Sequence, residues 1–345
     1  MMGSSTSLLL PLSIILFASF FQGTFGLGMK YIKPLAWEAW WLVYALVAMI
    51  ILPWLWATLA VPDLIASIMA APSNAIWMAA LFGFLWGIGG IMFGVSVNYV
   101  GISITYGIVM GLAASMGSII PLLQMDNFSS NPAVPYIILG VLLLLVGVII
   151  SAIAGIKRDK LPTYTSGDVT SGKSNFQKGL LIAIASGVLS AFLNVGFTKA
   201  APVAEAAEAQ GALARNASLA AWVVVLLGAF VMNILYSLYL LFKNKSWKSY
   251  QNPGSGKAIG WAVLTGFFWF AALGVYGQGA ALMGELGPVI GWPMLLGLAL
   301  IISNIWAYRA GEWKGAAAPF RIMLFGVGVL IIACMVLGFS NSLSA

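Results

Sequence analysis

Ten apolar runs, each long enough to cross a lipid bilayer as a helix, constrain this chain more than any other feature. Crossing the hydrocarbon core takes about 20 mostly apolar residues. The runs cover residues 8–28, 39–60, 75–99, 102–124, 135–155, 178–199, 217–242, 258–283, 286–307 and 318–339. Only 7% of the 345 residues are charged, against about a quarter in soluble proteins. The sequence therefore predicts an all-α integral membrane protein with ten transmembrane helices, surrounded by lipid.

Lys and Arg residues are divided very unequally between the two sets of loops. Fourteen of the 16 fall on one set, namely Lys30, Lys33, Lys157, Arg158, Lys160, Lys173, Lys178, Lys243, Lys245, Lys248, Lys257, Arg309, Lys314 and Arg321. Only Lys199 and Arg215 fall on the other. Because cytoplasmic loops carry the excess of Lys and Arg, the Lys-rich loops are predicted to be cytoplasmic. An even number of spans then puts both termini outside the cytoplasmic membrane.

Two stretches of the chain repeat each other without a gap. Residues 81–86 (LFGFLW) are echoed by residues 264–269 (LTGFFW), in the third and eighth runs. A five-span unit has an odd number of spans, so a second copy must thread the membrane in the opposite sense, as in many transporters. The sequence thus predicts two inverted five-helix repeats, at residues 1–156 and 178–345. A flexible cytoplasmic linker at 157–177 would join them.

The chain offers few groups for catalytic or metal chemistry. It has no His and a single cysteine, Cys334, so the commonest metal ligand and general base is missing. No Walker loop is present, and the basic residues lie in loops between apolar runs, which does not point to nucleic acid. We therefore expect neither an enzyme nor a metal or cofactor site, and the sequence leaves the oligomeric state undetermined.

Motifs in nearly the whole chain match one family in their order and spacing. They are Trp37-Glu38, residues 51–54, residues 81–89 with Gly94, residues 187–191, residues 201–202 with 205–207, Trp269, Tyr276 and residues 311–313. These motifs resemble the L-rhamnose–proton symporter family, a branch of the drug/metabolite transporter superfamily. The resemblance implies the ten-helix drug/metabolite transporter fold. It also implies import of a 6-deoxyhexose such as L-rhamnose across the inner membrane by alternating access, with a proton as the coupling ion.

The chain departs from the family pattern at four positions. Gly90 and Met92 stand where better-known members carry polar amides, and Gln278 and Ala280 stand where they carry Trp and His. Another sugar or small neutral metabolite, sodium coupling, and export or uniport therefore stay open as alternatives. A cationic-drug exporter is disfavoured, because no predicted span holds a carboxylate near its middle.

Polar and aromatic side chains within the spans are the candidate substrate contacts. An amide offers the donors and acceptors that suit sugar hydroxyls, and an indole face packs well on the C–H face of a pyranose. The predicted substrate-binding residues are Gln22, Trp86, Tyr106, Asn194, Asn233, Trp269, Tyr276, Gln278 and Trp292. Interhelical hydrogen bonding is the alternative role for the amides, and core packing is the alternative for the aromatic residues.

Three further expectations concern helix shape and packing. Pro293 predicts either a broken ninth helix near the membrane centre or a simple kink. Other tryptophans are expected in the lipid–water belts, namely Trp37, Trp40, Trp41, Trp54 and Trp313. A face of small residues is expected to let helices approach closely, namely Gly83, Gly87, Gly90 and Gly94.

Cation coupling has to rely on carboxylates at the ends of spans. Proton symport normally needs a titratable group whose exposure alternates, and the candidates are Glu38, Glu205 and Glu285, with Glu312 as a weaker one. Helix capping and interfacial anchoring are the alternative roles. A cation held by backbone carbonyls and amides would need none of these carboxylates.

Overall fold

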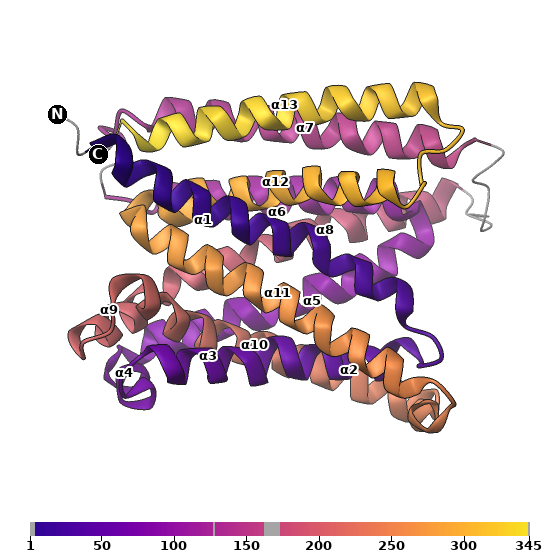
Figure 1. Ribbon diagram of the computed structural model, residues 1–345, viewed down its shortest axis with the longest axis horizontal. Helices are drawn as coiled ribbons and strands as arrows, with labels where there is room; N and C mark the ends of the chain where they lie inside the picture. The colour runs from indigo at the N-terminus through magenta and orange to yellow at the C-terminus, as the bar shows by residue number, and fades with distance from the viewer. Residues whose placement is uncertain (1–3, 127, 162–172, 344–345) are drawn as a thin grey trace. The chain divides into compact units, whose positions relative to one another are not determined.

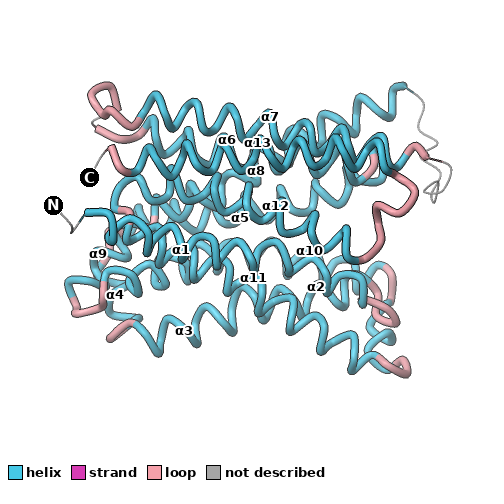
Figure 2. Tube along the Cα trace, turned by 45° about the horizontal axis from the view of Figure 1, so that its top comes forward, coloured by secondary structure: helices cyan, strands magenta, loops and turns pink. Residues whose placement is uncertain are grey.

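The computed structural model describes residues 4–126, 128–161 and 173–343, and this part of the chain consists of helices and loops (Figure 1, Figure 2). Ten of its helical segments are long and apolar enough to cross a membrane. The ten predicted spans are therefore confirmed. Most boundaries shift by a few residues, whereas the sixth span continues to Ala209 and does not end at residue 199. Within the predicted linker, Lys157, Arg158 and Asp159 form the last turn of the fifth span, and residues 162–172 lie outside the described residues.

Six spans are single helices, and four are composite. The single ones are α5 (Ser73–Val100), α6 (Ile102–Leu123), α7 (Val134–Asp159), α10 (Ala214–Lys243), α11 (Ser255–Leu282) and α13 (Ala317–Asn341). The first span is α1 (Ser4–Thr24) with η1 (Phe25–Tyr31), and the second is α2 (Trp37–Leu46), η2 (Val47–Ile51) and α3 (Leu52–Ala60). The sixth is α8 (Lys173–Lys199) with α9 (Ala201–Ala209), and the ninth is η5 (Gly284–Leu286) with α12 (Gly287–Arg309). Short helices α4 (Leu64–Ala70) and η4 (Ser246–Gln251) lie between spans.

The second span changes its helical pitch just before a proline. Pro53 lacks the N–H that would bond to the carbonyl four residues earlier. The preceding segment, η2, is a π-helical turn in which the Leu52 N–H donates to the Val47 carbonyl, five residues back. Such π-bulges are frequent at functional sites.

The chain divides into two compact units, each built from both parts of the sequence. Unit 1 comprises residues 1–87 and 195–284, and unit 2 comprises residues 88–194 and 285–345. The boundaries fall inside α5, after Gly87, and inside α8, after Asn194. The residues of each predicted repeat are therefore shared between the two units.

Within unit 1, glycines bring helices into backbone contact. A Cβ on Gly83 of α5 would overlap the Val225 carbonyl oxygen of α10, and a Cβ on Gly228 would overlap the Ala80 carbonyl oxygen in return. Gly266, the counterpart of Gly83 in the sequence repeat, brings α11 against η2 in the same way. The close approach predicted for Gly83 is therefore confirmed.

The rest of that glycine face behaves differently along α5. Gly87 is also closely packed, since a Cβ there would lie 2.8 Å from Met232 Cβ. The prediction is wrong for Gly90 and Gly94, because an added Cβ would meet no atom within 4 Å at either position. Both glycines are exposed.

Unit 2 is a stack of long helices. Here α7 packs along α13 and against α6, while α12 packs against both α6 and α13 (Figure 1). Glycines again sit at the contacts, because a Cβ on Gly140 would lie 2.6 Å from Leu337 Cγ and one on Gly147 would lie 2.8 Å from Leu330 Cγ. Small residues give membrane helices the close van der Waals packing that holds them together in lipid.

Candidate functional site

Five aromatic rings of unit 1 form a continuous series, which we call the aromatic ladder. It consists of Trp37, Trp41 and Tyr44 on α2, Trp269 on α11 and Trp86 on α5. Successive ring centroids are 5.0, 4.8, 6.1 and 5.3 Å apart in that order. The series begins at Trp37, which is 37% exposed, and leads to Trp269, which is 4% exposed. The aromatic rings therefore form a continuous series from the start of α2 to the middle of α11.

The inner end of the ladder joins the two copies of the sequence repeat. Trp86 and Trp269, predicted as symmetry-related residues from their positions in the repeat, stack on each other with an angle of 28° between the ring planes. Trp86 is half-buried, whereas Trp269 is held from the other side by the edge of Tyr44. The structure thus brings these two predicted residues together near mid-span.

Asn233 supplies the polar group nearest the outer part of the ladder. Its Oδ1 accepts a hydrogen bond of 2.8 Å from Trp41 Nε1, and its Nδ2 donates to the Ala229 carbonyl at 2.8 Å. The side chain is 3% exposed. The interaction fixes the orientation of the Trp41 indole and connects α2 to α10.

Tyr276 belongs to a second aromatic cluster of unit 1. Its ring lies 5.8 Å from Phe197 and 6.2 Å from Trp222, and Trp222 stacks on Phe197 at 4.5 Å. All three are buried, and Trp222 Nε1 has no hydrogen-bond partner among the described residues. Gly277 packs directly under that nitrogen, since a Cβ there would lie 2.6 Å from it. These contacts favour core packing, which is the alternative role that the sequence left open for Tyr276.

The two predicted glutamines of unit 1 are both half-buried. Gln22 lies near the end of α1, and its Oε1 is buried with no partner in the described part of the chain. Gln278 lies on α11 beyond the second cluster. A buried carbonyl oxygen without a donor is costly in hydrocarbon, so Gln22 is the better placed of the two to accept a ligand hydroxyl.

Asn194, in unit 2, uses both of its N–H groups within the protein. Its Nδ2 donates to the Gly117 carbonyl at 2.8 Å and to the Pro288 carbonyl at 2.9 Å. The Gly117 carbonyl needs this donor, because Pro121 stands four residues later in α6 and has no N–H. Asn194 thereby connects α8 to α6 and to the start of α12.

Trp292 and Pro293 show a similar internal arrangement. Trp292 Nε1 donates to the Ala113 carbonyl at 3.0 Å. Pro293 frees the Val289 carbonyl, and the Ser118 hydroxyl donates to it at 2.6 Å. Because this donor comes from α6, α12 continues from Gly287 to Arg309. The prediction of a broken ninth helix is therefore wrong.

Tyr106, also in unit 2, lies on α6 near its start. Its ring meets Phe93 edge-on at 6.3 Å, and its hydroxyl interacts with the Ser303 side chain. Its contacts thus join α6 to α5 and α12 within unit 2.

Among the described carboxylates, only Glu38 is buried, with 6% of its surface exposed. It occupies the first turn of α2, where the positive end of the helix dipole favours a negative charge. Its Oε1 accepts hydrogen bonds from Asn244 Nδ2 at 3.0 Å and Ser246 Oγ at 2.5 Å. Next to it, the Tyr250 hydroxyl donates to the Ala39 carbonyl, and burial raises the pKa of Tyr250. Glu38 thus connects α2 to the turn between α10 and η4.

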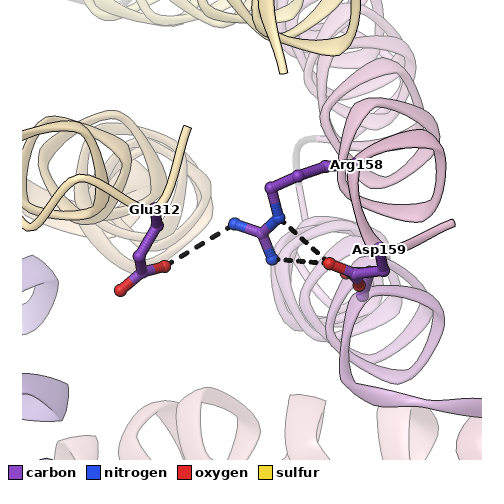
Figure 3. A network of polar contacts seen from close by, with 4 residues as sticks. Arg158, Asp159 and Glu312 are labelled. Carbon is purple, nitrogen blue, oxygen red and sulfur yellow. Dashed lines mark hydrogen bonds and ion pairs between the residues drawn. The ribbon is translucent and has the colours of Figure 1, made fainter. Parts of the chain in front are cut away.

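The other coupling candidates are more exposed. Glu205 on α9 and Glu285 in η5 are both exposed. Glu312 forms an ion pair with Arg158, at 3.6 Å, and Arg158 also bonds to Asp159 (Figure 3). Arg158 lies over the Trp313 ring at 5.0 Å. This network holds the end of α7 against the loop between α12 and α13, all within unit 2.

Sequence reasoning missed three members of the ladder, Trp37, Trp41 and Tyr44, and misplaced two buried indoles. Nothing singled out Tyr44, and Trp41 was assigned to the lipid–water belt although its N–H is bonded to Asn233. The belt assignment is wrong for Trp40 and Trp313, which are 0% and 7% exposed. Both lie near the ends of spans, so position along the helix suggested a belt. Only neighbouring helices could show which side of the helix is covered.

The protein is a polytopic membrane protein with ten helical spans. Aromatic and amide side chains gathered inside one unit are typical of membrane proteins that bind and move solutes. The family model for the L-rhamnose-proton symport protein matches residues 7–342. The chain belongs to this family, which is one of transporters and not of enzymes.

Curated relatives agree over most of their length. An L-rhamnose-proton symporter of Yersinia pestis (strain Pestoides F) is 28% identical over 318 residues, covering 90% of this chain and 91% of that protein. The symporter of Yersinia pseudotuberculosis serotype O:1b (strain IP 31758) gives the same figures. A solved structure described as "Crystal structure of protein" covers 96% of this chain and 99% of its own, with 14% identity and a TM-score of 0.48.

Proposed function

We propose that this protein is a secondary active transporter that imports a 6-deoxyhexose such as L-rhamnose across the inner membrane by alternating access, coupled to a proton. The observation that carries the proposal is the stack of Trp86 on Trp269 near the middle of their spans. An apolar aromatic surface suits the C–H face and the methyl group of a 6-deoxy sugar. Family membership supports the same substrate class.

The drug/metabolite transporter fold, with two inverted five-helix repeats, is part of this proposal. Helix pairs inside each unit support it, because they join spans that would be equivalent. In unit 1, α2 contacts α10 (spans two and seven), and Trp86 meets Trp269 (spans three and eight). In unit 2, α6 contacts α12 and α7 contacts α13 (spans four with nine, five with ten). A two-fold axis in the membrane plane would bring equivalent spans together in this way.

We assign substrate contact to residues of unit 1. Trp86 and Trp269 would supply aromatic faces, and Gln22, Asn233, Tyr276 and Gln278 would supply polar atoms. Asn194 and Trp292 lie in unit 2 and hold its helices together, because their N–H groups are donated to backbone carbonyls. Asn233 also donates to a backbone carbonyl, and we keep it as a contact because its other partner, Trp41, belongs to the aromatic ladder. Tyr106 is a possible contact outside this group.

The mutual stack also defines a step in binding. Trp86 and Trp269 face each other at 5.3 Å, so a sugar ring has no room between them in this conformation. The sugar would bind the half-buried Trp86 and replace one aromatic partner by another. Trp269 belongs both to this stack and to the contact with Tyr44. Opening the stack would therefore displace the rings of the ladder as far as Trp37, at the start of α2.

We further propose Glu38 as the proton-coupling group. It is the buried member of the three candidates, whereas Glu205 and Glu285 are exposed. Protonation would weaken its hydrogen bonds to Asn244 and Ser246 and so loosen the connection between α2 and the end of α10. Since α2 also carries three rings of the ladder, protonation and sugar binding would act on the same helix.

The proposed orientation has the Lys-rich loops in the cytoplasm and both termini outside. This arrangement follows from the excess of Lys and Arg in those loops. Within unit 1, Glu38 lies on that side, together with η4 and the start of α11. A proton released from Glu38 would therefore leave toward the cytoplasm.

The transport proposal is tested by reconstituting the full chain in proteoliposomes. We expect radiolabelled L-rhamnose to accumulate under an inward proton gradient, and not under a sodium gradient alone. Equal uptake with and without any ion gradient would contradict symport. Accumulation of a different sugar, with no accumulation of L-rhamnose, would assign the protein to that sugar.

The coupling proposal needs a measurement that separates coupling from folding. We expect E38Q to lose gradient-driven accumulation while keeping the exchange of labelled for unlabelled sugar, and E205Q and E285Q to retain both. Normal accumulation by E38Q would exclude Glu38. Loss of both activities together with a lower melting temperature would make Glu38 a structural anchor only.

A further inference from the structure

An open pocket of unit 1 lies at the Lys-rich end of the first and eighth spans. Its volume is about 640 Å³, and it is lined by the segment from Met29 to Leu35 and by Gly254, Lys257, Ala258 and Trp261. The first segment ends η1 and leads to α2, and the second begins α11. The pocket therefore lies where the first span ends and the eighth begins, at the predicted membrane–water boundary.

The charge of this pocket has one sign. Lys30, Lys33 and Lys257 all line it and are all exposed, and none of its described lining residues is acidic. Three ammonium groups around one concave surface attract an anion. The pocket also lies at the N-terminal end of α11, whose dipole adds a partial positive charge.

Aromatic and apolar surface continues from the pocket along α11. Tyr31 stacks on Trp261 with centroids 4.3 Å apart and 14° between the planes, and Tyr31 is 49% exposed. One and two turns further into the span, Leu264 and Phe267 are 40% and 47% exposed. A free anion would gain nothing from contact with this apolar surface, whereas an acyl chain would pack along it.

We propose that this pocket binds the headgroup of an anionic phospholipid. The three lysines would hold the phosphate, the Tyr31–Trp261 pair would lie at the level of the glycerol backbone, and the exposed face of α11 would contact an acyl chain. Basic pockets between membrane helices on the cytoplasmic side commonly hold anionic headgroups. The site is separate from the aromatic ladder, and the proposal does not depend on the identity of the transported solute.

The test uses native mass spectrometry of the purified full chain, with phosphatidylglycerol and phosphatidylcholine as probes. We expect the wild type to retain phosphatidylglycerol in preference to phosphatidylcholine. The variant K30Q/K33Q/K257Q should bind phosphatidylglycerol about tenfold more weakly, because each lysine near an anionic headgroup contributes to binding. Inorganic phosphate at millimolar concentration should not displace the lipid.

The matched control is K243Q/K245Q/K248Q, which removes three exposed lysines outside the pocket at the same end of unit 1. It should retain phosphatidylglycerol within about twofold of the wild type, with only long-range electrostatics changed. Equal losses in the two triple variants would overturn the proposal, since binding would then follow net charge. Equal retention of phosphatidylcholine, or displacement by phosphate, would also overturn it. The melting temperatures of all variants separate loss of lipid from unfolding. K257Q is a milder substitution of the same pocket that serves if the triple variant does not fold.

Discussion

Buried polar atoms without a partner are distributed unequally between the two units. In unit 2, Asn194, Trp292 and Ser118 donate to backbone carbonyls of α6 and α12, two of which prolines have freed. In unit 1, Glu38 and Asn233 have partners, but buried polar atoms of Gln22, Trp40, Trp222, Ser237 and Ser249 have none among the described residues. Within the described part of unit 2, Trp313 alone has such an atom. Because unpaired polar atoms are costly in hydrocarbon, this distribution agrees with the proposal that the ligand binds in unit 1.

Aromatic content reinforces this difference. The aromatic ladder and the Tyr276 cluster both lie in unit 1, where rings contact rings across helices. In unit 2 the ring contacts form isolated pairs or short groups, such as Tyr136 with Phe339, and α7 meets α13 through glycines and aliphatic side chains at Gly140 and Gly147. Four substitutions test whether the two units differ in function as they do in packing.

The largest effect is expected at the closest helix contact of unit 1. In G83A the new methyl group overlaps the Val225 carbonyl oxygen, and overpacking costs about 1–3 kcal/mol or more. We expect a clear loss of folded protein and a lower melting temperature in detergent. The control is G90A, on the same helix, where an added Cβ meets nothing within 4 Å. Equal melting temperatures for the two variants would show that this contact is not close in the folded protein.

The second prediction concerns the polar anchor of unit 2. N194A leaves the Gly117 carbonyl without a donor, because Pro121 has no N–H to replace it, and an unsatisfied buried group costs about 1–3 kcal/mol. The melting temperature should fall while the sugar dissociation constant, measured on the folded fraction, stays unchanged. N233A is the comparison in unit 1, and it should weaken sugar binding more than it lowers stability. The reverse pattern would contradict the division of roles between the units.

A third substitution probes the inner end of the ladder. W86A removes one face of the aromatic pair, and we expect about a tenfold rise in the sugar dissociation constant, equivalent to about 1.4 kcal/mol. W292F keeps a ring in unit 2 but loses the bond to Ala113, so it should change stability and not affinity. Isothermal titration with L-rhamnose measures the sugar affinity of the two variants, and their melting temperatures in detergent measure stability. Unchanged affinity in W86A would reject the aromatic site.

The smallest effect is expected in the ion-pair network of unit 2 (Figure 3). Arg158 and Glu312 are partly exposed, at 17% and 37%, and such pairs contribute about 0–1 kcal/mol. R158A should therefore lower the melting temperature slightly and leave transport unchanged, with R158K, which keeps the charge, in between. A large loss of transport in R158A would mean that the network takes part in coupling.

The sequence alone predicted the elements and the importance of one pair of residues. Long apolar runs leave a chain in lipid no alternative to helices, since backbone groups must be satisfied within each span. All ten spans could therefore be predicted, and so could the importance of Trp86 and Trp269, because they occupy matching places in a repeated segment. The repeat gave no direct indication that the two rings touch.

The side of each helix that is covered, and the residues that cover it, are known only from the packing of the helices. The sequence pattern around a polar residue in a span is the same whether the residue binds a ligand or a backbone carbonyl. Asn194 and Asn233 differ only in their neighbours, as do the buried Trp40 and the exposed Trp37. The spans are apolar on all sides, so no polar face reveals their orientation. That information comes only from contacts between residues far apart in the sequence.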